Sequence, residues 1–105
     1  MIIIDIKDFS RYPGPRYMRL GDFSGELFRS SVLMPALAND DEVTVNFDGV
    51  YGYGSSFLEE AFGGLVRNGV DKAKIVRLKN NLVCNDDPSI VIEVKKYIDE
   101  ALSGR

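Results

Sequence analysis

The chain has 105 residues, of which 45% are hydrophobic and 28% charged, and its formal net charge is -3. This composition is typical of a single globular domain, which we expect to cover residues 1–105. The acidic balance argues against non-specific nucleic-acid binding, which needs a basic surface. The sequence has no histidine, which excludes a Ser-His-Asp or Cys-His nucleophile and the usual His-bearing zinc sites. No apolar run approaches the roughly 20 residues that span a bilayer, and the single cysteine, Cys84, suits a reducing cytoplasm.

The N-terminal part of the chain predicts two strands followed by a helix. Residues 2–6, rich in isoleucine, are expected to form an N-terminal strand. Residues 17–20 are expected to form a second short strand, so that the two make a hairpin-like unit. Ser24 is a suitable N-cap for a helix that extends to about Ala38. Pro35 lies within that helix, where a proline costs roughly 3 kcal/mol, so we expect a kink there or a break into two pieces.

Residues 43–66 show the clearest local pattern in the chain. Apolar and polar side chains alternate from Val43 to Phe47, which indicates a strand with one face against a core. A loop rich in glycine follows, and apolar residues at helical spacing then predict a helix that starts at the serine pair. Ser56 and Glu59 have the spacing of a capping box, in which each side chain bonds the backbone near the other.

The C-terminal part predicts a third core strand and a last helix. Residues 74–78 are expected to form that strand, parallel to the preceding one because a helix connects the two. Asn68-Gly69 is a helix end signal, and Asp87-Pro88 is a helix start with Asp as N-cap. The predicted fold is therefore α/β, with a mixed β-sheet of about four strands, helices packed on it and the element order β-β-α-β-α-β-α. The paired glycines Gly63-Gly64 inside the central helix indicate a close approach by a neighbouring element.

The segment VNFDGVYGYGSSFLEEAFGGL, with support from GDFSGELFR and LMPAL, resembles the STAS-like family of unknown function (DUF4325). These are small bacterial and phage-borne domains, similar to the STAS domains of anti-sigma factor antagonists. With the order of predicted elements included, the resemblance covers about residues 20–102. It implies a STAS-like sandwich and a non-enzymatic regulatory role in binding another protein.

The resemblance also implies a phosphorylation site. In STAS antagonists, the first serine of an Asp-Ser-Ser-Gly motif at a helix N-terminus is phosphorylated by a partner kinase with a histidine-kinase-like (GHKL) ATPase fold. By position that serine is Ser55, and Ser56 is its neighbour, so both are candidate phosphoacceptors. The motif is incomplete, since Gly54 replaces the acidic residue and Phe57 replaces the glycine. Simple helix capping is the alternative role of the two serines.

The loop before the serines supplies candidate partner-binding residues, because aromatic side chains on surface loops are favoured interface anchors. Tyr51, Tyr53, Gly54 and Phe57 are the candidates for contact with a protein partner in the cytoplasm. Of the two tyrosines, we expect one to pack into the core and the other to contact the partner. The alternative function is a small ligand-binding domain that holds an anion or nucleotide at the Gly54-Ser55-Ser56 helix N-terminus. The glycines are not followed by the Lys-Ser/Thr of a P-loop.

No catalytic residue, metal ligand or cofactor site is predicted, because no general base is evident beside the serines and no cation-binding spacing is present. One cluster combines basic and aromatic residues: Arg11, Tyr12, Arg16, Tyr17 and Arg19. The overall acidity opposes a nucleic-acid role for it. The sequence does not indicate an oligomeric state.

Overall fold

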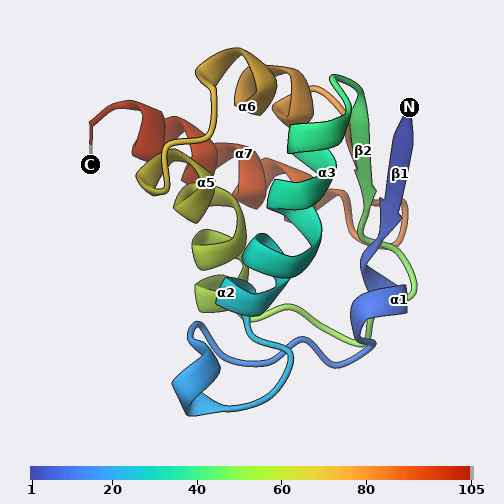
Figure 1. Cartoon of the computed structure of the whole chain (residues 1–105). Helices are drawn as coiled ribbons and strands as arrows, with labels where there is room; N and C mark the ends of the chain where they lie inside the picture. The colour runs from blue at the N-terminus through green and yellow to red at the C-terminus, as the bar shows by residue number, and fades with distance from the viewer. Residues whose placement is uncertain (105) are drawn as a thin grey trace.

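The computed structural model describes residues 1–104. Its elements follow in the order β1 (Ile2–Asp5), α1 (Ile6–Phe9), η1 (Met18–Leu20), α2 (Gly25–Phe28), η2 (Arg29–Leu33), α3 (Met34–Asn39), β2 (Val43–Asn46), α4 (Ser55–Leu58), η3 (Glu59–Gly63), α5 (Gly64–Arg67), α6 (Lys72–Lys79), β3 (Leu82–Val83) and α7 (Pro88–Leu102). The element η1 is a 3-10 turn, whereas η2 and η3 are π-helical turns. Each π turn therefore lies between two α-helical pieces of one longer helix, as Figure 1 shows for α2 to α3.

The sheet has three strands in the order β1-β2-β3, and both pairings are parallel. The registers pair Ile4 with Val45 and Val45 with Leu82. Figure 1 shows β1 and β2 side by side. The predicted α/β class is confirmed, and so are the first strand and the alternating central strand, whose Val43 and Val45 are buried. The expectation of a mixed sheet of about four strands is wrong in both number and orientation.

Two predicted strands are absent from this sheet. Residues 17–20 lie in and beside η1 and are exposed, and none of them pairs with a strand in the part of the chain that the structure describes. Residues 74–78 belong to the helix α6, in which Ile75 and Leu78 are buried three positions apart while Val76 is exposed. The Asp71 side chain accepts a hydrogen bond from the Ala73 amide and so caps this helix. The strand that follows the central helix and pairs parallel to β2 is instead β3, which comes after α6.

Pro35 does not interrupt the first long helix. The π turn η2 ends just before it, with the Met34 amide bonded to the Arg29 carbonyl, and α3 begins at Met34. An interior proline removes one hydrogen bond and crowds the preceding turn, and the altered spacing of a π turn accommodates both. Of the two predicted outcomes at Pro35, a kink or a break into two helices, the break is wrong, because α2, η2 and α3 follow one another without a gap. The distortion of the helix is the π turn that precedes Pro35. The predicted N-cap is confirmed, because the Ser24 hydroxyl accepts from the Leu27 amide.

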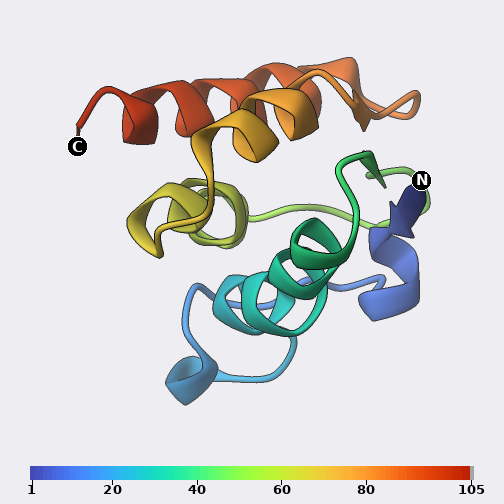
Figure 2. The same cartoon turned by 45° about the horizontal axis from the view of Figure 1, so that its top comes forward.

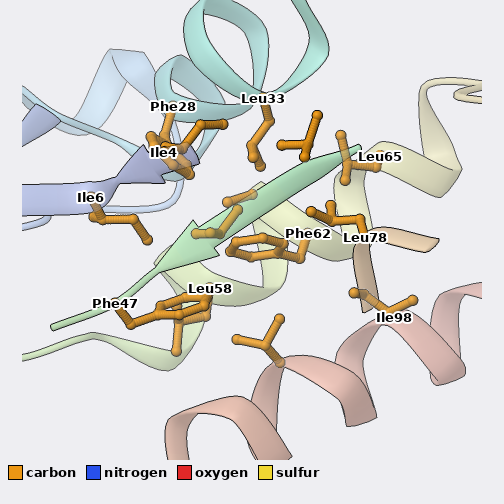
Figure 3. Close-up of a cluster of buried hydrophobic side chains, with 14 of the residues drawn as sticks. Ile4, Ile6, Phe28, Leu33, Phe47, Leu58, Phe62, Leu65, Leu78 and Ile98 are labelled. Carbon is orange, nitrogen blue, oxygen red and sulfur yellow. The ribbon is translucent and has the colours of Figure 1, made fainter. Parts of the chain in front are cut away.

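The last helix is formed as predicted: Asp87 caps α7, and Pro88 occupies its first turn. Figure 2 shows α6 and α7 on one side of α4–α5 and the helix from α2 to α3 on the other, with the strands at one end of these layers. Figure 3 shows the buried side chains that meet between the sheet and the helices, among them Ile4, Phe28, Phe47, Phe62 and Ile98. Among residues 1–104, no helix combines the length and the apolar character that a membrane crossing requires.

Candidate functional site

The loop 47–54 connects β2 to α4, and two aspartates fix its first turn. The Asp48 carboxylate accepts from the Asp86 amide at 2.8 Å and from the Asn85 side chain at 3.2 Å. In return, the Gly49 amide donates to the Asp86 carboxylate at 3.0 Å. The hydrogen bonds that the Asp48 carboxylate accepts lower its pKa, and the bond from the Asp86 amide has the largest effect. Gly49 has φ +82°, a backbone region that favours glycine. The start of the loop is therefore held against the segment that follows β3.

Tyr51 projects from the middle of this loop. Its ring stacks on that of Tyr12, with centroids 4.7 Å apart and planes 11° from parallel. Both side chains are nevertheless 72% exposed. The Tyr51 amide donates to the Arg11 carbonyl, and the Arg11 guanidinium donates to the Gly49 carbonyl, so backbone bonds hold the two loops together. The result is a stacked pair of exposed aromatic rings on two loops that hydrogen bonds join.

Tyr53 has a different environment from Tyr51. It is half-buried, its hydroxyl donates to the Phe47 carbonyl at 2.7 Å, and its ring packs edge-on against Phe47. Burial raises the pKa of Tyr53 well above its ordinary value. Phe57 is fully buried among the core aromatics Phe9 and Phe28. The expectation that Phe57 contacts a partner is therefore wrong, because its side chain does not reach the surface.

The candidate phosphoacceptors lie at the exposed start of α4. Gly54 is the N-cap, Ser55 and Ser56 are the first two helical residues, and all three are exposed. Neither serine caps the helix through its side chain, and the Glu59 carboxylate instead binds Arg16 and Arg67. The predicted capping box is therefore wrong, because it needs the serine at the N-cap and the glutamate at the third helical position. With Gly54 as the N-cap, Ser56 is the second helical residue and Glu59 lies beyond the third.

One side chain of α7, that of Tyr97, lies beside the first serine. The Tyr97 hydroxyl donates to the Glu93 carboxylate at 2.5 Å. This bond is the main reason that the pKa of Tyr97 is raised to about 12, and the neighbouring Ser55 side chain acts in the opposite direction. Ser55 is thus adjacent to the Tyr97 hydroxyl of another helix, and that hydroxyl is itself bonded to Glu93.

A small cleft of about 260 Å³ opens between this loop and the start of α7. We call it the loop cleft. Its aromatic, apolar and acidic lining includes Tyr51, Tyr53, Val50, Ile90, Asp86 and Asp87. The cleft connects the exposed Tyr51 ring with two carboxylates that no other part of residues 1–104 neutralises through a salt bridge.

A buried ion-pair network was not predicted from the sequence. Arg29 and Glu60 are each 7% exposed, and their side chains join the π turns η2 and η3 at 2.5 Å. Arg16 and Arg67 also contact Glu60, at 3.2 and 3.4 Å. The Arg29 side chain lies against Gly64, where an added Cβ would come 2.5 Å from the guanidinium. The expected close approach by a neighbouring element is thus confirmed at Gly64, where the approaching group is the Arg29 side chain. At Gly63 the atoms nearest to an added Cβ belong to Glu59 and Arg67 of the same long helix.

The predicted basic-aromatic cluster is divided in the structure. Arg11 binds the Gly49 carbonyl, whereas Arg16 binds Glu59 and Glu60. The guanidinium carbons of Arg16 and Arg19 lie 6.0 and 5.4 Å from the centre of the Tyr17 ring. Arg16, Tyr17 and Arg19 therefore stay together, while Arg11 lies against the loop 47–54. Within residues 1–104, no group of three or more His, Cys, Asp or Glu side chains is placed to hold a metal ion.

Comparison with known proteins gives one match. The model of a family described as a STAS-like domain of unknown function (DUF4325) matches residues 24–81, more than half of the chain. The matched segment contains both π turns, β2, the whole loop 47–54 and the serine pair. No curated protein and no solved structure matches the chain.

Proposed function

The chain belongs to the STAS-like domain family of unknown function (DUF4325), and from this premise we propose that it is a non-enzymatic regulatory domain that docks a cytoplasmic protein. The docking surface comprises Tyr51, Gly54, Ser55 and Ser56, together with the stacked Tyr12. We further propose that phosphorylation of Ser55 switches this docking, and that the partner has a histidine-kinase-like ATPase fold.

One observation carries the proposal. Two serines whose exposed hydroxyls form no capping bond start the helix α4. They follow the exposed ring of Tyr51, which stacks on Tyr12, by a few residues. Aromatic rings that are already held in place lose little conformational entropy on binding, which favours their use as interface anchors. Because Ser55 and Ser56 are exposed, a modifying enzyme can reach them without unfolding the domain.

The surroundings of Ser55 suit it to a switch. A phosphate there carries about -1.5 to -2 charges near neutral pH, and it sits at the positive N-terminal end of the helix. Glu93 opposes the phosphate by like-charge repulsion, whereas the Tyr97 hydroxyl is able to turn from Glu93 to donate to it. Modification of Ser55 thus rearranges contacts between α4 and α7, while modification of Ser56 adds charge alone.

The test is direct phosphorylation. Wild type, Ser55→Ala and Ser56→Ala are each incubated with a candidate histidine-kinase-like ATPase and ATP, and modified peptides are identified by mass spectrometry. We expect phosphate on Ser55 in the wild type and in Ser56→Ala, and none in Ser55→Ala. Unmodified serines in all three proteins, with an ATPase that phosphorylates a control substrate, would contradict the switch.

The alternative, an anion or nucleotide held at Gly54-Ser55-Ser56, has weaker support. The helix start supplies free amides, but the adjacent loop cleft is lined by Asp86 and Asp87, which repel an anion. A shift in melting temperature with inorganic phosphate, in the absence of any protein, would favour this alternative.

A further inference from the structure

The loop cleft carries unpaired negative charge. The charged residues that line it, Asp86 and Asp87, are both acidic and exposed. Neither forms a salt bridge with any residue that the structure describes. Each uses one carboxylate oxygen internally: Asp86 accepts from the Gly49 amide, and Asp87 accepts from Ser89. The second oxygen of each receives no recorded hydrogen bond from residues 1–104, so both remain available to a donor from outside.

Nearby positive charge does not cancel these carboxylates. The N-terminus of α7 contributes about half an elementary charge, which Asp87 offsets as its cap. Arg11 and Lys7 lie against Gly49 and do not line the cleft. The cleft itself therefore favours a cation.

The remaining walls suit a flat cation with an apolar stem. Tyr51 and Tyr53 provide aromatic rings, and Val50 and Ile90 provide apolar surface. A guanidinium is planar and weakly hydrated, stacks on aromatic rings and donates two parallel hydrogen bonds to a carboxylate, whereas the lysine ammonium is more strongly hydrated. The volume of about 260 Å³ lies below the range of ~300–1,000 Å³ that is usual for drug-sized ligands. It suits a single side chain.

We propose that the loop cleft binds an arginine side chain on an extended segment of the partner protein. The inference rests on the proposed docking function and adds the chemistry of the partner to it. The guanidinium lies against Tyr51 and donates to Asp86 and Asp87, and the peptide backbone on either side passes over the exposed rings of Tyr51 and Tyr12.

The experiment titrates the isotopically labelled full chain with two short capped peptides by NMR. The probe is Ala-Pro-Arg-Pro-Ala, and its matched control carries citrulline, the neutral isostere, in place of arginine. We expect the arginine peptide to shift the amide signals of Gly52, Tyr53 and Ile90, and the citrulline peptide to shift them far less. Equal binding of the two peptides, or shifts confined to other parts of the molecule, would overturn the proposal.

Three variants locate the site. Asp86→Asn keeps a hydrogen-bond acceptor, and Asp87→Ser keeps a helix cap, so both remove charge with little structural change. Each is expected to weaken arginine-peptide binding about two- to fivefold. Asp99→Asn removes the same charge on α7, where its partner is Lys79, and is expected to change the affinity by less. An equal loss of affinity in Asp99→Asn would show that net charge alone attracts the peptide, and it would overturn the assignment of the site to the loop cleft. If Asp86→Asn does not fold, the affinity of Asp87→Ser for the arginine peptide tests the site.

The failure of this inference is distinguishable from failure of the proposed function. If neither peptide binds while Tyr51→Ala still abolishes capture of the protein partner, the docking surface stands and the arginine assignment is wrong. If the arginine peptide binds as described while Tyr51→Ala and Ser55→Asp leave capture of the partner unchanged, the cleft binds arginine and the proposed regulatory surface is wrong.

Discussion

Tyr12 and Tyr51 stack nearly parallel although each is 72% exposed. Their rings come from loops that lie 39 positions apart in the sequence, and bonds between Arg11 and the 49–51 backbone keep those loops in contact. Exposed aromatic area of this kind contributes little to folding and much to binding when a partner covers it. The pair therefore marks the face of the domain that we assign to docking.

The Tyr51→Ala variant shows whether this side chain serves binding or the stability of the fold. We expect Tyr51→Ala to lower the free energy of unfolding by no more than about 1 kcal/mol, the size of one exposed aromatic contact. Tyr53→Ala removes a half-buried ring and the hydrogen bond to the Phe47 carbonyl, and we expect it to cost about 3 kcal/mol or more. Urea unfolding of the two variants measures the difference. Equal losses of unfolding free energy in Tyr51→Ala and Tyr53→Ala would show that Tyr51 stabilises the fold by packing.

The buried ion pair predicts unequal effects for two adjacent glutamates. Glu60→Ala leaves the buried Arg29 guanidinium without its carboxylate, which typically costs about 3–5 kcal/mol. Glu59→Ala removes contacts with the more exposed Arg16 and Arg67, and we expect a loss of about 1 kcal/mol. Denaturant unfolding of both variants gives the comparison. A Glu60→Ala variant as stable as Glu59→Ala would mean that water reaches Arg29.

Two glycines with ordinary backbone angles predict opposite responses to alanine. At Gly25 an added Cβ would lie 2.5 Å from the Phe57 carbonyl oxygen, so α2 and α4 would have to separate. We expect Gly25→Ala to cost more than about 1 kcal/mol. At Gly54 no atom lies within 4 Å of the added Cβ, and φ is -78°. There we expect a neutral change or a gain of up to about 1 kcal/mol. Thermal unfolding distinguishes the two, and a stabilised Gly25→Ala would contradict the close approach.

The Asp48 carboxylate predicts a dependence of stability on pH. Its pKa is lowered from 3.8, first by the hydrogen bond from the Asp86 amide. A carboxyl group with a lower pKa in the folded state stabilises that state above its unfolded pKa, and this contribution is lost as the pH falls through the folded value. We expect the wild type to lose more stability than Asp48→Asn between pH 5 and pH 3, with the pH values chosen to bracket roughly the ordinary carboxyl pKa. Parallel curves for the two proteins would contradict this role of Asp48.

Local patterns in the sequence were sufficient for some elements. The alternation from Val43 to Phe47 and the Asp87-Pro88 start of the last helix each contain their own signal, and both were predicted correctly. Residues 74–78 were assigned to a strand because a short apolar run fits either period, and only packing decides between them. The strand β3 has two residues, too few to show any period.

The site was only partly predictable for a similar reason. The exposure of Ser55, Ser56 and Tyr51 agrees with the sequence-based hypothesis, whereas the burial of Phe57 depends on packing against Phe9 and Phe28, far away in the chain. The Arg29–Glu60 pair joins residues 31 positions apart. No local spacing rule connects such residues, so the network could not be deduced from the order of the residues alone.

The most direct measurement of the docking surface is a quantitative affinity capture with immobilised domain variants. Wild type, Tyr51→Ala, Ser55→Ala and Ser55→Asp are compared with Ile92→Ala, which removes another exposed apolar side chain from α7. We expect wild type, Ser55→Ala and Ile92→Ala to retain the same protein, Tyr51→Ala to lose it, and Ser55→Asp to retain a clearly different amount. Capture that is equal across all five proteins would contradict a regulatory surface at Tyr51 and Ser55.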